Sequence, residues 1–228
     1  MNRYAVIVAG GSGSRMGVGI PKQFRCLKGK PLLWWSLDAF HKENATTGLI
    51  VVLPEQFIDL WKDLFSALPN EEQYEHLITI GGESRTQSVV NGLKLIADFN
   101  SLVAVHDAAR PLVTPDLISR GWNVAIKDGA GVPVIPVTDS LRELDSAGNN
   151  SKSVDRSRYV AVQTPQVFQT EILKGAYEKS NDSNFTDDAT VVENFGLKIT
   201  LFEGSYRNIK VTNPSDIEIA TILMDKYA

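Results

Sequence analysis

Short apolar runs alternate along the first half of the chain with longer segments of mixed polarity. The apolar runs are short, continuous and bounded by turn residues, which is typical of buried strands; they lie at residues 4–8, 48–53, 77–80 and 102–105. The segments between them carry apolar side chains at helical spacing, at residues 31–43, 55–68 and 89–97. This order predicts a three-layer α/β/α, Rossmann-like fold with a mostly parallel, twisted sheet.

The second half of the chain predicts further elements of the same fold. Thr114 and Pro115 form an N-cap followed by a proline at the first helical position, so a helix is expected to begin there. Residues 131–137 predict a strand, but Pro133 and Pro136 each lack an N–H, which favours an edge or irregular strand. The remaining apolar patterns predict helices at residues 170–180 and after Thr186, and β structure at residues 198–202 and 208–212.

Residues 138–158 depart from this pattern. A turn-rich centre at residues 145–151 is flanked by polar segments that contain little core-forming material. A hairpin of this composition cannot bury much of its own surface, so we expect it to rest on another subunit. The 228 residues are therefore predicted to form one domain, residues 1–228, with residues 138–158 as a dimerisation arm.

Composition and charge narrow the range of expected binding partners. The chain is 43% hydrophobic and carries a formal net charge of −4, yet residues 1–30 contain lysines and arginines but no acidic residue. A local cationic field on an acidic protein suits a small, highly charged anion better than nucleic acid. The apolar runs are too short to span a membrane and no secretory signal pattern precedes residue 9, so a cytoplasmic protein is expected.

A glycine-rich loop follows the first predicted strand and is the strongest candidate for ligand binding. Gly10, Gly11 and Gly13 allow backbone N–H groups to approach a phosphate closely. No glycine in the loop is followed by Lys and then Ser or Thr, which excludes a P-loop, and Met16 occupies the third glycine position of the dinucleotide fingerprint. The loop is instead accompanied by Arg15 and Lys22, cations suited to charge on a transferring phosphoryl group.

Two other predicted strands end in residues with binding chemistry. Asp107 follows the apolar run at residues 102–105, and a carboxylate at that end of a strand favours a Mg²⁺ ligand over a turn cap. Its neighbour His106 is expected to be a packed side chain and not a base. A second glycine turn at residues 81–85 is expected to lie beside the first loop, because parallel strands end at one edge of the sheet.

Seven stretches of the chain together carry a resemblance to a known family. In order from residue 9 to residue 216 they are AGGSGSRMG, PKQF, GGESRTQSV, HDAARP, SVDRSRY, QTPQVF and NIKVTNPSD. They resemble the 2-C-methyl-D-erythritol 4-phosphate cytidylyltransferase family, whose fold is of the nucleotide-diphospho-sugar transferase type. The resemblance implies an enzyme that joins CTP to 2-C-methyl-D-erythritol 4-phosphate and releases pyrophosphate, in the non-mevalonate isoprenoid pathway.

The resemblance also implies roles for individual residues. Catalysis is expected from Arg15, Lys22 and Lys210, and the magnesium ligand from Asp107. The residues expected to hold CTP are Ala9, Gly10, Gly11, Gly13, Gly82, Arg85, Ser88, Asp107 and Ala108. Those expected to hold the polyol phosphate are Asp107, Arg110, Ser140, Arg156 and Lys210, with Ser140 and Arg156 reaching the site of the partner in a homodimer.

The implied reaction is a single in-line displacement by the substrate's own phosphate, which needs no general base. Three alternatives remain open at this point. They are a ribitol 5-phosphate cytidylyltransferase of the same fold, an NAD-dependent oxidoreductase, which Met16 opposes, and a non-catalytic nucleotide sensor. The motif containing Ala108 and Ala109 favours the erythritol enzyme over the ribitol enzyme.

Overall fold

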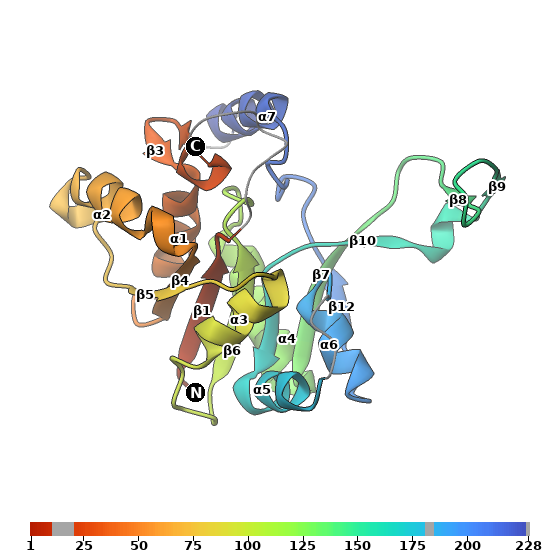
Figure 1. Ribbon diagram of the computed structural model, residues 1–228, viewed down its shortest axis with the longest axis horizontal. Helices are drawn as coiled ribbons and strands as arrows, with labels where there is room; N and C mark the ends of the chain where they lie inside the picture. The colour runs from red at the N-terminus through yellow and green to blue at the C-terminus, as the bar shows by residue number, and fades with distance from the viewer. Residues whose placement is uncertain (11–20, 181–184, 227–228) are drawn as a thin grey trace.

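The protein is built around one eight-stranded sheet with helices on both faces. The computed structural model describes residues 1–10, 21–180 and 185–226. The sheet has the strand order β10-β7-β11-β6-β1-β4-β5, with β12 paired to β7 (Figure 1). The α/β/α fold expected from the alternating pattern is therefore confirmed.

One half of the sheet is entirely parallel. Its strands are β1 (Arg3–Val8), β4 (Gly48–Leu53), β5 (Leu77–Ile80) and β6 (Leu102–Asp107). The chain moves outward from β1 to β4 and β5, then returns to place β6 on the other side of β1. This reversal makes the carboxyl ends of β1 and β6 a topological switch point, where open α/β sheets bind ligands.

The other half of the sheet is mixed. It contains β7 (Ala130–Pro136), β10 (Val160–Val162), β11 (Gln166–Gln169) and β12 (Thr200–Glu203). β10 and β11 run antiparallel to β7, and β11 also runs antiparallel to β6, while β12 is parallel to β7.

Residues 131–137 were expected to form an edge or an irregular strand, and the edge alternative is wrong. β7 lies inside the sheet, with β12 on one side and β10 and β11 on the other. Pro133 is tolerated there because its position faces the break between β10 and β11, where its carbonyl accepts from the N–H of Gln163 at 2.8 Å. Pro136 is the last residue of the strand, so few sheet hydrogen bonds are lost.

The alternation of side chains along the central strands divides the core in two. Ala5 and Ile7 pack on one face of the sheet with α1, α2 and α4, whereas Val6 packs on the other face with α3, α5 and α6. The helices of the first face are α1 (Leu32–Glu43), α2 (Ile58–Ser66) and α4 (Pro115–Asp128). Those of the second face are α3 (Arg85–Leu93), α5 (Thr170–Lys179) and α6 (Asp188–Asn194).

Short elements and α7 complete the body of the molecule. The helix expected at residues 55–68 is divided into the 3-10 turn η3 (Glu55–Phe57) and α2. α7 (Pro214–Asp225) packs near β2 (Cys26–Leu27) and β3 (Lys30–Pro31), and Leu27 and Val211 share a small buried cluster there. The other 3-10 turns are η2 (Lys22–Phe24), η4 (Asn70–Glu72) and η5 (Arg156–Arg158). Residues 208–212 contact the body without forming the β strand that their alternation suggested.

The arm predicted at residues 138–158 is a separate hairpin. β8 (Arg142–Leu144) and β9 (Ser151–Ser153) pair only with each other among the described residues, and all six of their residues are exposed. Figure 1 shows the hairpin projecting far from the sheet, beyond β7 and β10. Within the described parts of the chain, no helix has the length and apolar character needed to cross a membrane.

Candidate active site

A pocket of about 390 Å³ opens at the switch point between β1 and β6. The two strands end side by side, since Val8 and Asp107 are register partners and the Ala108 N–H donates to the Val8 carbonyl at 3.1 Å. The described residues that line the pocket come from these strand ends and the residues just after them, from the start of η2, from the turn before α3, from the beginning of α3 itself and from Lys210. The site therefore has the position expected for a ligand in this type of sheet.

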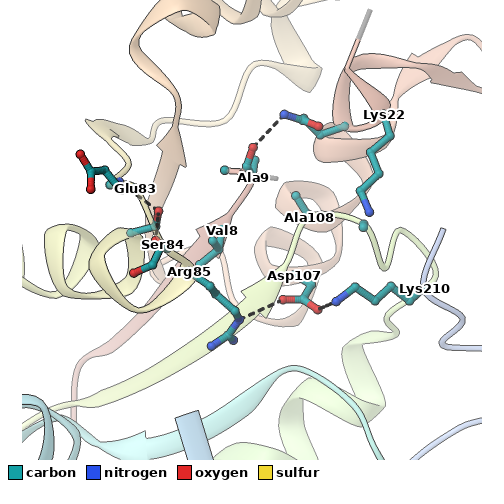
Figure 2. A pocket seen from close by; sticks show the side chains of 14 residues that line it. Val8, Ala9, Lys22, Glu83, Ser84, Arg85, Asp107, Ala108 and Lys210 are labelled. Carbon is teal, nitrogen blue, oxygen red and sulfur yellow. Dashed lines mark hydrogen bonds and ion pairs between the residues drawn. The ribbon is translucent and has the colours of Figure 1, made fainter. Parts of the chain in front are cut away.

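Asp107 lies at the centre of the charged groups in this pocket. Its Oδ2 is 2.7 Å from the Lys210 Nζ, its Oδ1 is 3.7 Å from the Arg85 Nε, and its side chain is 13% exposed. Figure 2 shows the carboxylate between these two cations. Burial alone would raise the pKa of Asp107, but Lys210 and then Arg85 outweigh burial and hold the pKa well below its usual range. Asp107 is therefore an anion at neutral pH.

Lys22 and Gln23 attach η2 to the pocket. The Lys22 Nζ donates to the Val211 carbonyl at 3.1 Å, and the Gln23 Nε2 donates to the Ala9 carbonyl at 2.8 Å. Val211 is itself tied to the strand end, because its N–H donates to the Ala109 carbonyl at 2.7 Å. These bonds hold Lys22 close to the end of β1 and to the segment that carries Lys210 (Figure 2).

The turn before α3 forms another wall of the pocket. Ser84 caps the helix by accepting from the Gln87 N–H at 3.1 Å. The buried Ser88 hydroxyl accepts from the Gly82 N–H at 3.0 Å and donates to the Ser84 carbonyl at 2.9 Å. A Cβ at position 82 would lie 2.0 Å from the Gln87 Cγ, so only glycine fits there without rearrangement. Ser88 thus holds the shape of the turn that carries Gly82.

His106 is fully buried beneath the pocket, as expected for a packed neighbour. One consistent tautomer satisfies its contacts: Nε2 donates to the Arg110 carbonyl at 3.2 Å, and Nδ1 accepts from the Thr164 hydroxyl at 3.2 Å. The same hydroxyl accepts from the Asp107 N–H at 3.0 Å. Burial lowers the pKa of His106 to about 4, so it is neutral at physiological pH and both of its ring nitrogens are engaged.

Comparison with known proteins identifies the family. The family model described as 2-C-methyl-D-erythritol 4-phosphate cytidylyltransferase matches residues 4–226. The chain belongs to this family. A member from Bacteroides thetaiotaomicron is 45% identical, with 98% of this chain and all of the relative covered, and one from Porphyromonas gingivalis is 42% identical, with 97% of each covered.

Solved structures of this cytidylyltransferase family share the fold. The crystal structure of the 2-C-methyl-D-erythritol 4-phosphate cytidylyltransferase from Thermus thermophilus superposes with a TM-score of 0.78 at 32% identity, covering 99% of this chain and all of the other. That of the Francisella tularensis enzyme superposes with a TM-score of 0.80 at 29% identity, covering 98% and 100%. The similarity to cytidylyltransferases therefore extends over nearly the whole chain, and the family match at residues 4–226 spans the arm.

The structure brings together all of the predicted nucleotide-site residues that it describes. The residues predicted for this cytidylyltransferase site that line the pocket are Ala9, Gly10, Lys22, Gly82, Arg85, Ser88, Asp107, Ala108 and Lys210. Gly11, Gly13 and Arg15 lie outside the described residues. Arg85 is not a solvated helix residue, because its guanidinium is paired to the carboxylates of Asp107 and Asp188.

Three of the five residues predicted for the polyol phosphate, Arg110, Ser140 and Arg156, do not line this pocket in the single chain. The Arg110 Nη1 donates to the Asn208 carbonyl at 2.8 Å, near the base of the arm. Ser140 is exposed on the arm, and Arg156, also on the arm, donates to the Thr138 carbonyl. Among the predicted substrate residues, only Asp107 and Lys210 line the pocket.

The cationic character of residues 1–30 is only partly directed at the pocket. Arg3, Lys28 and Lys30 form ion pairs with Glu43, Asp225 and Glu72 outside the site. Of the described part of that stretch, Lys22 is the lysine that lines the pocket. The sequence argument from local charge therefore overstated the field at the site.

Two functional features escaped sequence reasoning. The sequence assigns Gln23 no role beyond its place in the PKQF stretch, although its buried amide supports the end of β1. The sequence predicts Thr186 as the cap of helix α6, with Asp187 and Asp188 as acids in its first turn that suit the helix dipole. The structure corrects this: Asp187 is the N-cap, and Asp188 pairs with Arg85 at 2.6 Å. No local sequence signal distinguishes the two, because the partner lies 103 residues away.

Proposed function

We propose that this protein transfers a cytidylyl group from CTP to 2-C-methyl-D-erythritol 4-phosphate, forming 4-diphosphocytidyl-2-C-methyl-D-erythritol and pyrophosphate. This activity is supported by membership of the cytidylyltransferase family, which matches the chain along nearly its full length. The observation that carries it in the molecule is Asp107, an ionised carboxylate at the switch point with Lys210 and Arg85 on either side. Such an arrangement suits a polyphosphate and a cation bound together.

The chemistry proceeds as one in-line displacement. An oxygen of the polyol's phosphate forms a bond to the α-phosphorus of CTP, and the bond from that phosphorus to the bridging oxygen of the β-phosphate breaks. Pyrophosphate leaves with the electron pair of the broken bond. The attacking phosphate is already an anion, so no side chain has to remove a proton. The neutral, doubly hydrogen-bonded His106 is consistent with a reaction that needs no base.

The residues of the chain supply position and charge. Two mutually repelling anions must be held together, and cations fixed beforehand around the reacting phosphorus reduce that cost. Lys22 and Lys210, which both line the pocket near Ala108, are assigned to this task (Figure 2). Arg15 is assigned with them from the sequence, and Gly82, Arg85 and Ser88 are assigned to the nucleoside end of the pocket.

A magnesium ion fits the donor set of this site. Within the described residues no group of three acidic, histidine or cysteine side chains is placed to enclose a metal. Glu83 and Asp107 are the carboxylates that line the pocket, and we assign Asp107, at the strand end, as the protein's donor. A hard cation that keeps water and phosphate oxygens as its other ligands needs no more than this. When bound, Mg²⁺ would neutralise phosphate charge, and Asp107 is the residue that would hold it.

We further propose that the second substrate is bound with help from a second copy of the chain. The arm buries no core of its own, and Ser140 and Arg156 on it are remote from the pocket of their own chain. In a homodimer, each arm would present these side chains to the partner's polyol phosphate. Arg110, near the base of the arm, is assigned to the same substrate.

The test is pyrophosphate release by the purified protein with CTP and Mg²⁺. 2-C-methyl-D-erythritol 4-phosphate and ribitol 5-phosphate are offered in parallel, and the first is expected to be turned over preferentially. Preference for ribitol 5-phosphate would keep the displacement but reassign the substrate. No release with either substrate would overturn the proposed function in favour of a nucleotide sensor.

A further inference from the structure

A buried acidic residue lies directly behind the pocket. Asp188, the first residue of α6, has no exposed surface. Its Oδ2 accepts from the Arg85 Nη2 at 2.6 Å, and its Oδ1 accepts from the Tyr177 hydroxyl at 2.6 Å. Its backbone N–H donates to the Gln166 Oε1 at 3.0 Å. Both carboxylate oxygens and the backbone are therefore fixed, so Asp188 is a rigid acceptor for Arg85.

Capping of α6 does not account for this carboxylate. The neighbouring Asp187 caps the helix, since its Oδ1 accepts from the Thr190 N–H at 3.1 Å, and its Oδ2 accepts from the Gln166 Nε2 at 3.0 Å. A buried carboxylate is costly unless it is paired, so Asp188 needs a partner beyond the helix. That partner is a residue of the pocket wall, although Asp188 itself does not line the pocket.

Arg85 lies between two carboxylates at unequal distances. The contact with Asp188 is 2.6 Å and directly hydrogen-bonded, whereas the contact with Asp107 is 3.7 Å. Burial alone would lower the pKa of Arg85, but Asp188 outweighs it, and Asp107 adds to the effect, so the pKa is raised. If the charge of Asp188 were removed, Asp107 would become the nearest anion to the guanidinium.

We propose that Asp188 is a positioning residue, which holds the Arg85 guanidinium at the wall of the nucleotide pocket and prevents it from closing onto Asp107. This inference rests on the proposed function, because it assumes that the pocket of Arg85 and Gly82 receives CTP. Asp188 acts through Arg85 and touches no substrate. Through Asp188 in α6 and its hydrogen-bond partner Tyr177 in α5, two helices on one face of the sheet help to position a residue of the site.

The test is a double-mutant cycle on the full-length enzyme. Asp188→Asn keeps the shape of the side chain but removes its charge, and is expected to raise the KM for CTP by about tenfold, since a charged hydrogen bond to Arg85 is lost. The KM for the polyol phosphate should stay within about twofold of the wild-type value. In the variant that also carries Arg85→Gln, the KM for CTP should equal that of Arg85→Gln alone, because both changes remove the same interaction.

Asp187→Asn is the matched control, since it makes the same chemical change one residue earlier without touching Arg85. It should leave the KM for CTP at the wild-type value. If Asp188→Asn folds poorly, Tyr177→Phe removes only the hydroxyl that fixes the Asp188 Oδ1 and should raise the same KM by about threefold.

The results of this test distinguish a failure of the positioning role of Asp188 from a failure of the proposed function. Effects of Asp188→Asn and Arg85→Gln that multiply would overturn the positioning role while leaving CTP binding by Arg85 intact. A lower melting temperature with an unchanged KM for CTP would also overturn it, because the role would then be structural only. If Arg85→Gln itself leaves the KM for CTP unchanged, both the nucleotide role of Arg85 and the positioning role fall.

Discussion

The pocket and the arm belong to one chain but are held in place by different contacts. The pocket lies at the ends of β1 and β6, whose residues are buried or half-buried and which pair with a neighbouring strand on both sides. The arm consists of two three-residue strands that pair only with each other among the described residues, and every residue in them is exposed. The chain by itself thus orders the described residues proposed for the nucleotide, whereas the arm is proposed to gain its contacts from a second copy of the chain.

The largest effect on activity is expected in the pocket, which is the more rigid of the two regions. Asp107→Asn should reduce kcat by about a thousandfold, because it removes the anion between Lys210 and Arg85 and the proposed magnesium donor. Steady-state kinetics measure the effect, and circular dichroism checks the fold. Asp116→Asn, on an exposed carboxylate of α4, is the charge-matched control. Activity near the wild-type level in the Asp107 variant would contradict the assignment of the site.

Lys22→Ala should have the next largest effect. Lys22 lines the pocket from η2, and we expect kcat to fall by about a hundredfold while the KM for CTP rises much less, as for a group that acts mainly in the transition state. Initial rates over a range of CTP concentrations separate the two parameters. A change confined to KM would remove Lys22 from the transition state and leave it a binding residue.

Mixing two inactive or impaired variants would test whether the arm serves another chain. Arg156→Ala should raise the KM for the polyol phosphate by about tenfold or more, because a cation facing a phosphate is lost. Asp107→Asn keeps an intact arm but lacks a working pocket. When the two variants exchange subunits freely, about a quarter of all sites should combine an intact pocket with an intact arm.

Activity of the mixture at low polyol phosphate should therefore exceed the sum of the two separate variants. A mixture no more active than that sum, under conditions where subunit exchange is verified by a tag, would show that the arm does not work across a dimer. Sedimentation of the wild-type protein as a monomer would have the same consequence.

The smallest expected effect concerns stability outside both regions. His76 accepts from the Trp61 Nε1 at 2.9 Å through Nε2, while its Nδ1 lies 2.8 Å from the Tyr74 carbonyl and donates to it. Burial lowers the pKa of His76, so as the pH falls its imidazole is protonated in the unfolded state before it is protonated in the folded state. Stability should therefore decrease below about pH 6.5, the ordinary pKa of histidine.

Urea unfolding at pH 7.5 and pH 5 measures this contribution. The free energy of unfolding of His76→Gln should fall less between the two pH values than that of the wild type, by about 1 kcal/mol, because glutamine does not titrate. Equal decreases in the two proteins would show that His76 is not the titrating group. Activity at pH 7.5 should be little changed, since His76 packs against Trp61 and Phe65, away from the pocket.

Local pattern predicted the parallel half of the fold because each strand there is a continuous apolar run with a helix after it. The caps of α4 and α7 were also predictable, since Thr114 and Asn213 each precede a proline at the first helical position. The mixed half was harder to predict. The place of β7 in the sheet depends on where its two partners β10 and β11 end and begin along it. The prolines within β7 contain no information about those partner strands.

The same division applies to the site. Asp107 and Gly82 were predictable because strand ends and glycine turns converge at one edge of a parallel sheet. The contact of Asp188 with Arg85 was not, because it joins positions far apart in the chain through a side chain that looks like any acid in a first helical turn. The roles proposed for Ser140 and Arg156 rest on the family resemblance, because their proposed site belongs to a second copy of the chain.

The arm leaves the sheet and returns to it at one place. β7 ends at Pro136 and β10 begins at Val160, and these two residues are register partners. Residues 137–159 are therefore a side branch with adjoining ends, and their length and sequence can change without altering the path of the sheet. A graft of the corresponding branch from a relative would exchange one self-contained module, so the two halves of the proposed active site are open to separate evolution and separate redesign.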